Sequence, residues 1–247
     1  MDIESRRYRG LHVEKDLMHF SLQVEETDLD IAIRKDKDSE KLRLKVLELI
    51  RMHRQQLKDY MAIDTKFFTS FSPYELMECA PRAAMAMATA SATVDVGPIA
   101  AVAGYFAEEV GHLLTHYCED VIVENGGDIW LKSTCTRRIA IYAGDSPFSY
   151  SIGLEIRPET TPIGICTSSG TVGHAHSFGR ADAAVIIASS AVLADAVATA
   201  TGNMIQEICD LERAVDFALG IPGVSGALTI VGDQLAVRGD IKLVPLK

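Results

Sequence analysis

The 247-residue sequence has few aromatic side chains, at 6% with one tryptophan, and fewer basic residues (24) than acidic ones (34). The formal charge of −10 at pH 7 argues against non-specific nucleic-acid binding, because such binding needs a basic face that displaces counterions. Hydrophobic residues nevertheless make up 48% of the chain, which is enough for a folded core. We therefore expect a folded protein without a nucleic-acid partner.

Paired cysteines, an apolar leader and a long hydrophobic run are also missing. The five cysteines contain no C-x-x-C pair, which favours reduced thiols over a disulfide framework or a zinc site. The start MDIESRRYRG has no apolar h-region, so we expect no signal peptide and a cytoplasmic protein. Residues 83–107 are mainly Ala, Gly, Ser and Thr, interrupted by Asp95, Gly97 and Pro98, so we expect no membrane span.

Apolar periodicity predicts helices and strands in separate groups. Two strands around a turn at 25–27 precede a helix from about residue 39 to 61, whose apolar stripe includes His53. Ser72, Pro73 and Glu75 form a capping-box pattern that predicts a helix start. Further helices are expected at about 85–90, at 98–117, and as a pair within 191–220 that meets near Gly202.

Short runs with a period of two predict strands at 120–125, 128–133, 137–144, 150–156, 163–167 and 183–189. Residues 226–246 predict a closing hairpin that turns at Gly232–Asp233. No Rossmann or Walker fingerprint is present. Grouped strands with long helices between them predict an α+β fold with a largely antiparallel sheet packed with long helices. We expect one domain over residues 1–247, with a hairpin and helix at 1–61 and a core at 72–247 that carries the candidate site.

The stretch VENGGDIWLK places two glycines between two predicted strands. Gly126 and Gly127 can adopt positive φ and expose their backbone to a ligand. Asp128 begins the next strand, where its carboxylate can cap the turn or bind a hydroxyl group. A plain Asn-Gly-Gly hairpin turn explains the same pattern without any ligand.

The stretch CTSSGTVGHAHSFGRADA, residues 166–183, is too polar to be core. Backbone amides of its Ser/Gly part can form a phosphate-binding nest. His174 and His176 share one face of an extended chain and could hold a metal with Asp182 as third ligand. Cys166 could be a nucleophile with His174 as its base, whereas a serine nucleophile lacks the G-x-S-x-G signature. An ordinary surface loop is the remaining alternative.

The stretch ADAVATATGN places Asp195 and Thr199 four residues apart, on one face of a predicted helix. A carboxylate with a hydroxyl suits Mg²⁺, which binds few protein oxygens and keeps water or phosphate for its other positions. The alternative is that Asp195 caps a helix while Thr199 makes a buried hydrogen bond.

The sequence contains, in this order, the segments GPIAAVAGYFAEEVG, NGGDI, TSSG, a histidine and ADAVATA. This ordered set resembles the ApbE-like superfamily, which is best known for FAD:protein FMN transferases. Those enzymes carry a K-G-Y-x-x-D helix, a G-G-D-I turn, a T-S-G loop, an H-I-I-D-P segment and an A-D-A-x-x-T-A helix. The resemblance covers about residues 97–203. VENGGDI, YAGDSP, CTSSGTVGH and SFGRAD look most like a shorter branch of mostly uncharacterised proteins.

The resemblance implies a flavin or other nucleotide as ligand, FAD first of all, together with Mg²⁺. It implies cofactor-binding roles for Gly126, Gly127, Asp128, Glu108, Thr167, Ser168, Ser169 and Gly170. It implies Mg²⁺ ligation by Asp195 and Thr199, with the carbonyl of Ala100. His174 or His176 would be the catalytic base acting on a hydroxyl of an acceptor protein.

Two departures separate this sequence from the transferases. Ala103 stands where K-G-Y has its lysine, and HAHSFGRAD replaces H-I-I-D-P. Two functions therefore follow: a Mg-dependent FMN transferase, or an accessory protein that binds a ligand and supports a partner enzyme. The resemblance also suggests a link to sulfur assimilation, in homocysteine synthesis. The small-residue helix could alternatively line a homodimer interface.

Overall fold

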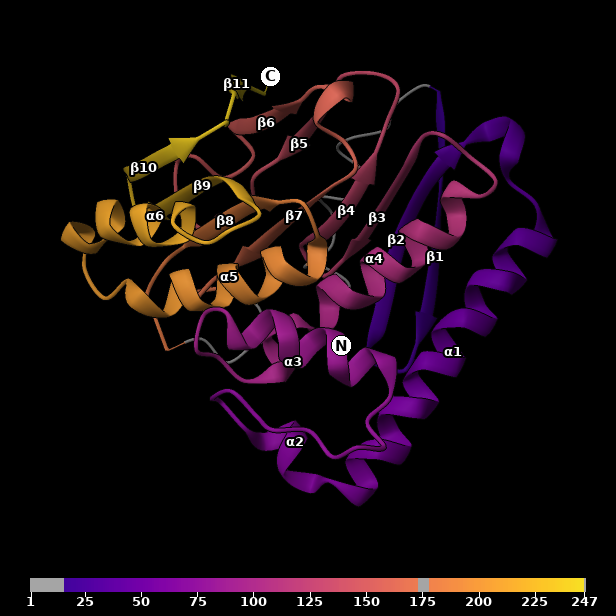
Figure 1. Ribbon diagram of the computed structural model, residues 1–247. Coiled ribbons are helices and arrows are strands. Elements are labelled where there is room, and N and C mark those ends of the chain that lie inside the picture. Colours follow the sequence, from indigo (N-terminus) through magenta and orange to yellow (C-terminus); the bar gives the residue numbers. More distant parts are fainter. Residues whose placement is uncertain (1–15, 173–177, 247) are drawn as a thin grey trace.

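The computed structural model describes residues 16–172 and 178–246 and has an eight-stranded antiparallel sheet at its centre (Figure 1). In spatial order the sheet consists of β1 (Leu17–Val24), β2 (Thr27–Arg34), β3 (Val121–Asn125), β4 (Asp128–Lys132), β7 (Ile163–Ser168), β8 (Ala183–Ala188), β9 (Val224–Val231) and β10 (Gln234–Gly239). A second antiparallel sheet has the order β11 (Leu243–Pro245), β6 (Ile152–Ile156), β5 (Arg137–Ala140). The predicted α+β class is confirmed.

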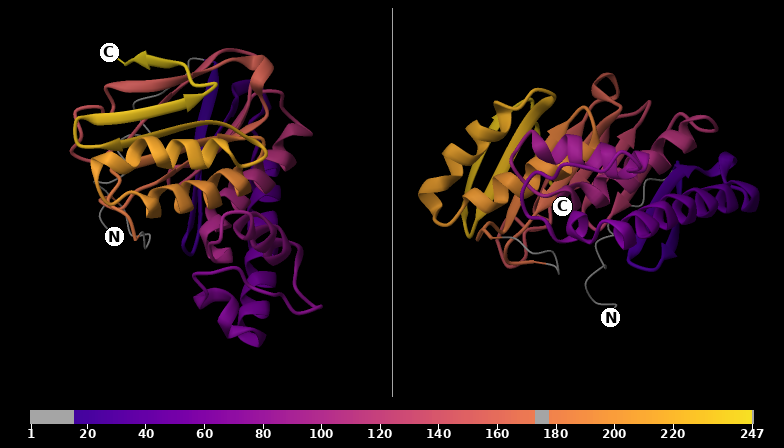
Figure 2. Two further views of the ribbon diagram at one scale, coloured as in Figure 1. Left: turned by 60° about the vertical axis from the view of Figure 1, so that its left-hand side comes forward. Right: turned by 60° about the horizontal axis from the view of Figure 1, so that its bottom comes forward.

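The helices cover one face of the large sheet, as Figures 1 and 2 show. They are α1 (Glu40–Ile63), α2 (Thr65–Thr69), α3 (Arg82–Ala92), α4 (Val102–Thr115), α5 (Ala191–Met204) and α6 (Leu211–Leu219). Short 3₁₀ turns lie at η2 (Lys35–Lys37), η3 (Pro98–Ala101), η4 (Pro158–Thr160) and η5 (Ile208–Asp210). Helix α5 packs directly on β7 and β8, and its neighbours are α3, α4, α6 and η3.

Each central strand divides its side chains between two apolar cores because successive residues point to opposite faces. Cys166 and Ile186 belong to the core under the helices. Ile165 and Ile187, one residue away on the same strands, belong to the core shared with the small sheet. Strands buried on both faces explain why β7 and β8 lack polar alternation in the sequence.

The predicted elements near the N-terminus are mostly confirmed. Helix α1 begins after Ser39, whose hydroxyl accepts a hydrogen bond from the backbone amide of Leu42, and the predicted stripe with His53 is buried. The predicted helix start at 72–75 is wrong, since residues 70–80 contain no helix. Tertiary contacts hold this segment instead: the Tyr74 hydroxyl donates to Asp64 Oδ1 at 2.6 Å. The next helix, α3, begins only after Pro81.

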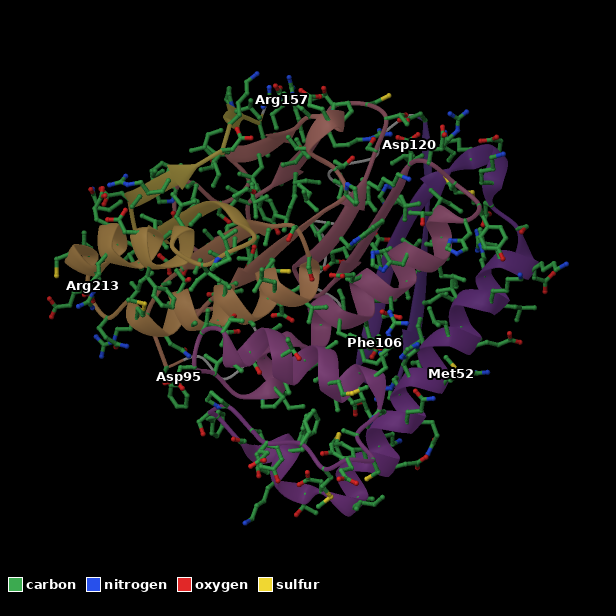
Figure 3. The ribbon with its side chains drawn as sticks, viewed as in Figure 1. Met52, Asp95, Phe106, Asp120, Arg157 and Arg213 are labelled. Carbon is green, nitrogen blue, oxygen red and sulfur yellow. The ribbon has the colours of Figure 1, made fainter. Side chains whose placement is uncertain are left out.

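The predicted helix over 98–117 is divided into η3 and α4. Asp95, labelled in Figure 3, lies in the turn before η3 with a φ of 58°. Gly97 lies two residues later, and a Cβ there would lie 1.8 Å from the Ser70 carbonyl oxygen. The chain therefore enters η3 in close contact with the segment that follows α2.

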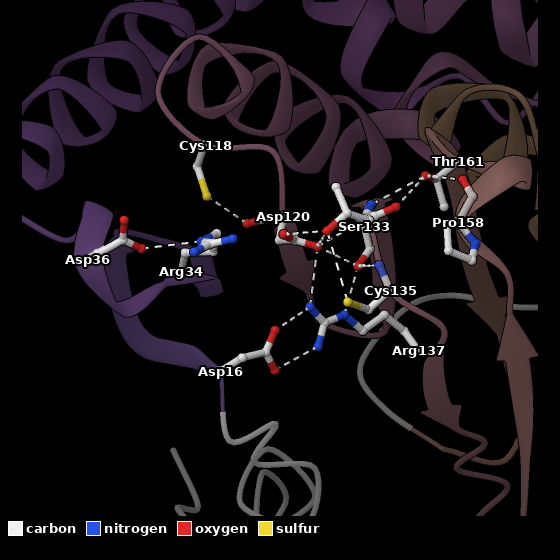
Figure 4. A network of polar contacts seen from close by, with 11 residues as sticks. Asp16, Arg34, Asp36, Cys118, Asp120, Ser133, Cys135, Arg137, Pro158 and Thr161 are labelled. Carbon is white, nitrogen blue, oxygen red and sulfur yellow. Dashed lines mark hydrogen bonds and ion pairs between the residues drawn. The ribbon is translucent and has the colours of Figure 1, made fainter.

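A buried polar network joins the start of the described chain to both sheets (Figure 4). Arg137 at the start of β5 makes two hydrogen bonds to Asp16, at 3.0 and 2.7 Å, and contacts Asp120 Oδ1 at 3.3 Å. Asp120 also accepts from the side chain of Ser133 and the backbone of Thr134, both at 2.7 Å. Within residues 16–172 and 178–246, no helix is long and apolar enough to cross a membrane.

Candidate functional site

The Asn-Gly-Gly segment forms a two-residue hairpin turn between β3 and β4. Asn125 pairs with Asp128, and Gly126 and Gly127 have φ values of 68° and 107°, as a type I′ turn requires. A Cβ at either glycine would meet nothing within 4 Å, so the outer side of the turn is open. The hairpin interpretation is confirmed. The Gly127 amide already donates to Glu124 Oε1 at 2.7 Å, so the part of the turn that is open to a ligand is its outer Cα side.

Asp128 points inward from this turn and is buried. Its Oδ1 atom has no hydrogen-bond partner. Burial raises the pKa of Asp128 well above its ordinary value, and the negative charge of Asp195 raises it further. A buried, unpaired carboxylate oxygen is costly unless a proton or a cation compensates it.

Asp195 lies in the second turn of α5 and faces the start of α4. Its Oδ2 accepts a hydrogen bond from the backbone amide of Gly104 at 2.8 Å. A Cβ at Gly104 would lie 2.2 Å from the Ala191 carbonyl oxygen and 2.8 Å from Asp195 Cβ, so α4 and α5 touch backbone to backbone here. Burial raises the pKa of Asp195 to about 7, although the amides of Gly104 and Ala103 oppose this.

Cys166 on β7 lies beside the two aspartates and is fully buried. Its thiol donates to the Ala191 carbonyl at 3.4 Å. Burial raises the pKa of the thiol, and the charges of Asp128 and Asp195 raise it further. A thiol kept protonated in this way does not suit the alternative role of nucleophile, because the thiolate is the reactive form.

Two further predicted metal ligands lie near Asp195. Thr199 follows one turn later on α5, is half-buried, and its hydroxyl makes no hydrogen bond within the described residues. Ala100 lies in η3, which packs against α5 and directly precedes α4. No cluster of three or more His, Cys, Asp or Glu side chains that could hold a metal occurs among residues 16–172 and 178–246. A cation here would therefore depend on few protein oxygens, as Mg²⁺ does.

The Thr-Ser-Ser-Gly loop leaves the end of β7 with several of its amides already in use. Ser169 Oγ accepts from the amides of Thr171 and Val172 at 3.1 and 2.9 Å, and the Gly170 amide donates to the Ala181 carbonyl at 2.8 Å. The predicted phosphate nest therefore lacks these three donors in this conformation. The hydroxyls of Thr167 and Ser168 are half-buried and make no hydrogen bond within the part of the chain that the structure describes.

Glu108 supports the site from α4. One carboxylate oxygen accepts hydrogen bonds from the Ser190 hydroxyl at 2.7 Å and from the amides of Ala191 and Val192 at 2.6 and 3.2 Å. This carboxylate satisfies free amides at the N-terminus of α5, which also favours a negative charge. Glu108 thus fixes the end of the helix that carries Asp195.

The two predicted catalytic histidines, His174 and His176, lie outside the described residues. Asp182, the third ligand considered for a histidine metal site, accepts from the Thr171 hydroxyl and from the Gly232 amide, both at 2.7 Å. Its carboxylate therefore holds the loop to the β9–β10 turn. Two clefts, of about 520 and 380 Å³, lie elsewhere, beside η4 and Lys242 and beside the end of α1.

Gly104 and Asn125 support the site but were not among the predicted site residues. Gly104 permits the helix contact and holds Asp195, and the Asn125 side-chain amide donates to the Ala103 carbonyl at 3.1 Å. A glycine inside a strongly helical pattern was the available signal for Gly104. Nothing local indicated that Asn125 reaches across to α4.

The fold is shared with solved structures of known class. The structure is similar to the flavin transferase ApbE from Vibrio cholerae, with a TM-score of 0.63 and 15% identity over 90% of this chain and 96% of that one. It is also similar to the ApbE protein from Thermotoga maritima, with a TM-score of 0.55 and 15% identity over 90% and 96% of the two chains. At these identities the likeness establishes an ApbE-like fold.

A family model described as "AbpE bacteria" matches residues 9–219, so the chain belongs to this ApbE-like family. Similar sequences are named UPF0280 proteins. The one from Methanocella arvoryzae is 42% identical over 194 residues, covering 78% of this chain and 79% of the relative. The one from Methanococcus aeolicus is 34% identical over 230 residues, covering 91% of each chain. The resemblance seen in the sequence is confirmed.

Proposed function

We propose that this protein binds a flavin nucleotide, with FAD as the first candidate, together with Mg²⁺. The observation that carries the proposal is the pair of buried carboxylates, Asp128 and Asp195, with Asp128 Oδ1 left without a hydrogen-bond partner. Burial raises the pKa of both carboxyl groups, and the charge of Asp195 raises the pKa of Asp128 further. A divalent cation would relieve both effects at once.

The oxygen donors around this pair fit Mg²⁺. Asp195 and Thr199 would hold the ion together with the carbonyl of Ala100. When bound, Mg²⁺ would neutralise negative charge on the phosphates. The unpartnered hydroxyls of Thr167 and Ser168 support a position for the phosphates beside the ion. The outer side of the Gly126–Gly127 turn is open and supports a position there for the remainder of the nucleotide. Glu108 holds the N-terminus of α5 through its hydrogen bonds to Ser190, Ala191 and Val192.

The reaction that this site would serve is transfer of FMN to a hydroxyl of an acceptor protein. The acceptor oxygen would form a bond to the FMN phosphorus, the pyrophosphate P–O bond would break, and AMP would leave. We propose that His174 or His176 takes the acceptor proton, because histidine is the side chain most often used as a general base. This assignment depends on the sequence resemblance.

A second candidate function is ligand binding without transfer, in an accessory protein that supports a partner enzyme, for which sulfur assimilation is the suggested setting. Ala103 favours it, because the transferases carry a lysine at this position and Ala103 lies next to the amide that holds Asp195. AMP release from FAD and Mg²⁺, measured by mass spectrometry with candidate acceptors, separates the two functions.

The first experiment is titration of the protein with FAD, followed by quenching of flavin fluorescence, with Mg²⁺ and with EDTA. We expect Mg²⁺-dependent binding that Asp195→Ala weakens at least ten-fold, about 1.4 kcal/mol. Asp233→Ala, in the exposed β9–β10 turn, is the matched control and should bind as the wild type does. Equal binding with and without Mg²⁺, or no binding at all, would refute the metal–flavin site.

A further inference from the structure

Two exposed phenylalanine rings contact each other near the C-terminal end of α5. Phe71 is 65% exposed and Phe178 is 63% exposed. Their ring centroids lie 5.4 Å apart with an interplanar angle of 73°, an edge-to-face arrangement. The rings come from segments far apart in the sequence, and leaving both in water is unfavourable. Such an exposed aromatic pair suggests a ligand or partner.

Phe178 is held next to the Thr-Ser-Ser-Gly loop by contacts between glycine backbones. A Cβ at Gly170 would lie 2.0 Å from the Gly179 carbonyl oxygen, and a Cβ at Gly179 would lie 1.8 Å from that of Gly202. The Phe178 amide also donates to Asn203 Oδ1 at 2.9 Å. Phe178 therefore has a fixed backbone position between the loop and the end of α5.

The Phe71 backbone lies against Gly97, the residue that precedes η3. The Ser70 carbonyl oxygen occupies the space where Gly97 would carry a Cβ, at 1.8 Å, and Phe71 Cα lies 3.0 Å from that point. Gly97 immediately precedes η3, which contains Ala100. Phe71 therefore lies near η3, which contains the proposed carbonyl ligand Ala100, and Phe178 lies near the Thr-Ser-Ser-Gly loop, which contains the proposed phosphate donors.

The distance between the proposed cation site and Phe178 suits the length of a nucleotide. Asp195, Thr199 and Asn203 follow one another at four-residue intervals on α5, so Asn203 lies about 6 Å along the helix from Thr199 and about 12 Å from Asp195. Phosphates beside Asp195 and Thr199 would place an attached ring within reach of Phe178, which Asn203 anchors.

We propose that Phe71 and Phe178 bind a planar heteroaromatic ring of the nucleotide whose phosphates occupy the Asp195–Thr199 site. This inference rests on the proposed function and adds a ring-binding surface to it. Phe71 lies outside the motifs on which the resemblance depends, whereas Phe178 belongs to one of them, SFGRAD. Base–aromatic stacking is strong but tolerant of ring type, so FAD, FMN and AMP are all suitable probes.

The test compares binding of FAD with Mg²⁺ to the wild type, Phe71→Ala, Phe178→Ala and the double variant by isothermal titration calorimetry. Each single variant should weaken binding about ten-fold and Phe178→Trp should retain it, as expected for stacking. Phe68→Ala removes a ring that is 53% exposed on α2 and serves as the matched control. Circular dichroism melts show whether each variant is folded.

Magnesium pyrophosphate, which has no ring, separates this inference from the proposed function. Its binding should be equal in the wild type and the double variant. If the double variant binds FAD as tightly as the wild type does, the ring-binding inference is wrong while the metal–phosphate site stands. If the double variant also loses pyrophosphate, the phenylalanines act by shaping the phosphate site and the inference is wrong. If the wild type binds no FAD, both proposals fall.

Discussion

Asp195→Asn should make the metal-free protein more stable above pH 7, although it removes the residue on which the proposed metal site depends. Burial raises the pKa of Asp195 from 3.8 to about 7, so the folded state disfavours the ionised carboxylate. The cost of ionisation begins above pH 3.8, grows as the pH rises, and is complete above about pH 7. Asparagine retains an oxygen that can accept the Gly104 hydrogen bond, and it carries no charge.

The magnitude follows from the same change in pKa. Each pKa unit corresponds to about 1.4 kcal/mol, so a rise from 3.8 to about 7 corresponds to at most about 4 kcal/mol. For a chain of this length, each kcal/mol changes Tm by about 2–4 °C. We therefore expect Asp195→Asn to raise Tm by several degrees at pH 8 in EDTA, and by less at pH 5.

Thermal melts followed by circular dichroism, with EDTA and with Mg²⁺ at each pH, provide the assay. Mg²⁺ at one hundred times its Kd should stabilise the wild type by about 2.7 kcal/mol and should leave Asp195→Asn unchanged. Asp233→Asn, in an exposed turn, controls for the loss of a charge. A lower Tm for metal-free Asp195→Asn at pH 8, or an undiminished response to Mg²⁺, would refute the reasoning.

Three further variants test the surroundings of the site and the buried network. Gly104→Ala should lower the free energy of unfolding by about 1–3 kcal/mol, because its Cβ would lie 2.2 Å from the Ala191 carbonyl; an unchanged urea midpoint would contradict this. Glu108→Ala should cost about 1–2 kcal/mol in thermal melts through loss of the α5 cap, with partial recovery in Glu108→Gln. Burial alone would raise the pKa of Asp120, but hydrogen bonds, including that from Arg137, lower it below 3.8. The ionised Asp120 therefore stabilises the folded protein above pH 3.8, and this stabilisation is lost as the pH falls through the lowered pKa. Arg137→Met should therefore cost about 3–5 kcal/mol at pH 7 and less near pH 3 in urea titrations, and an equal cost at both values would rule out the ion pair as the cause.

Local patterns predicted those parts of the fold whose interactions are themselves local. The Asn-Gly-Gly turn needs only two residues with positive φ, and the start of α1 needs only the hydroxyl of Ser39. The expected helix at 72–75 fails for the opposite reason. Its capping pattern is outweighed by a hydrogen bond from Tyr74 to Asp64, ten residues away. Propensity is a weak prior wherever such tertiary contacts exist.

The candidate site shows the same limit. Asp128 and Asp195 were each identified from a short motif, but no pattern in either motif indicates that burial raises the pKa of both and that the charge of one acts on the other. Their proximity depends on the order of β4 and β7 in the sheet and on α5 packing over β7. Gly104 makes that packing possible, because its lack of a side chain lets α4 and α5 touch.

Ala103 bears differently on the two parts of the proposed function, which are ligand binding and FMN transfer. The residue lies at the start of α4, next to the Gly104 amide that holds Asp195, and its carbonyl accepts the Asn125 side-chain amide. A lysine here would add a positive charge near Asp195, whereas alanine adds none and leaves the oxygens of the two buried carboxylates and the amides of residues 103 and 104 in place. Loss of that cation increases the need of the pair for another positive charge. Under the proposed function, we therefore expect this sequence to retain binding of a divalent cation and of the phosphates of its ligand, and transfer is the step that Ala103→Lys should strengthen if the chain is a weakened transferase.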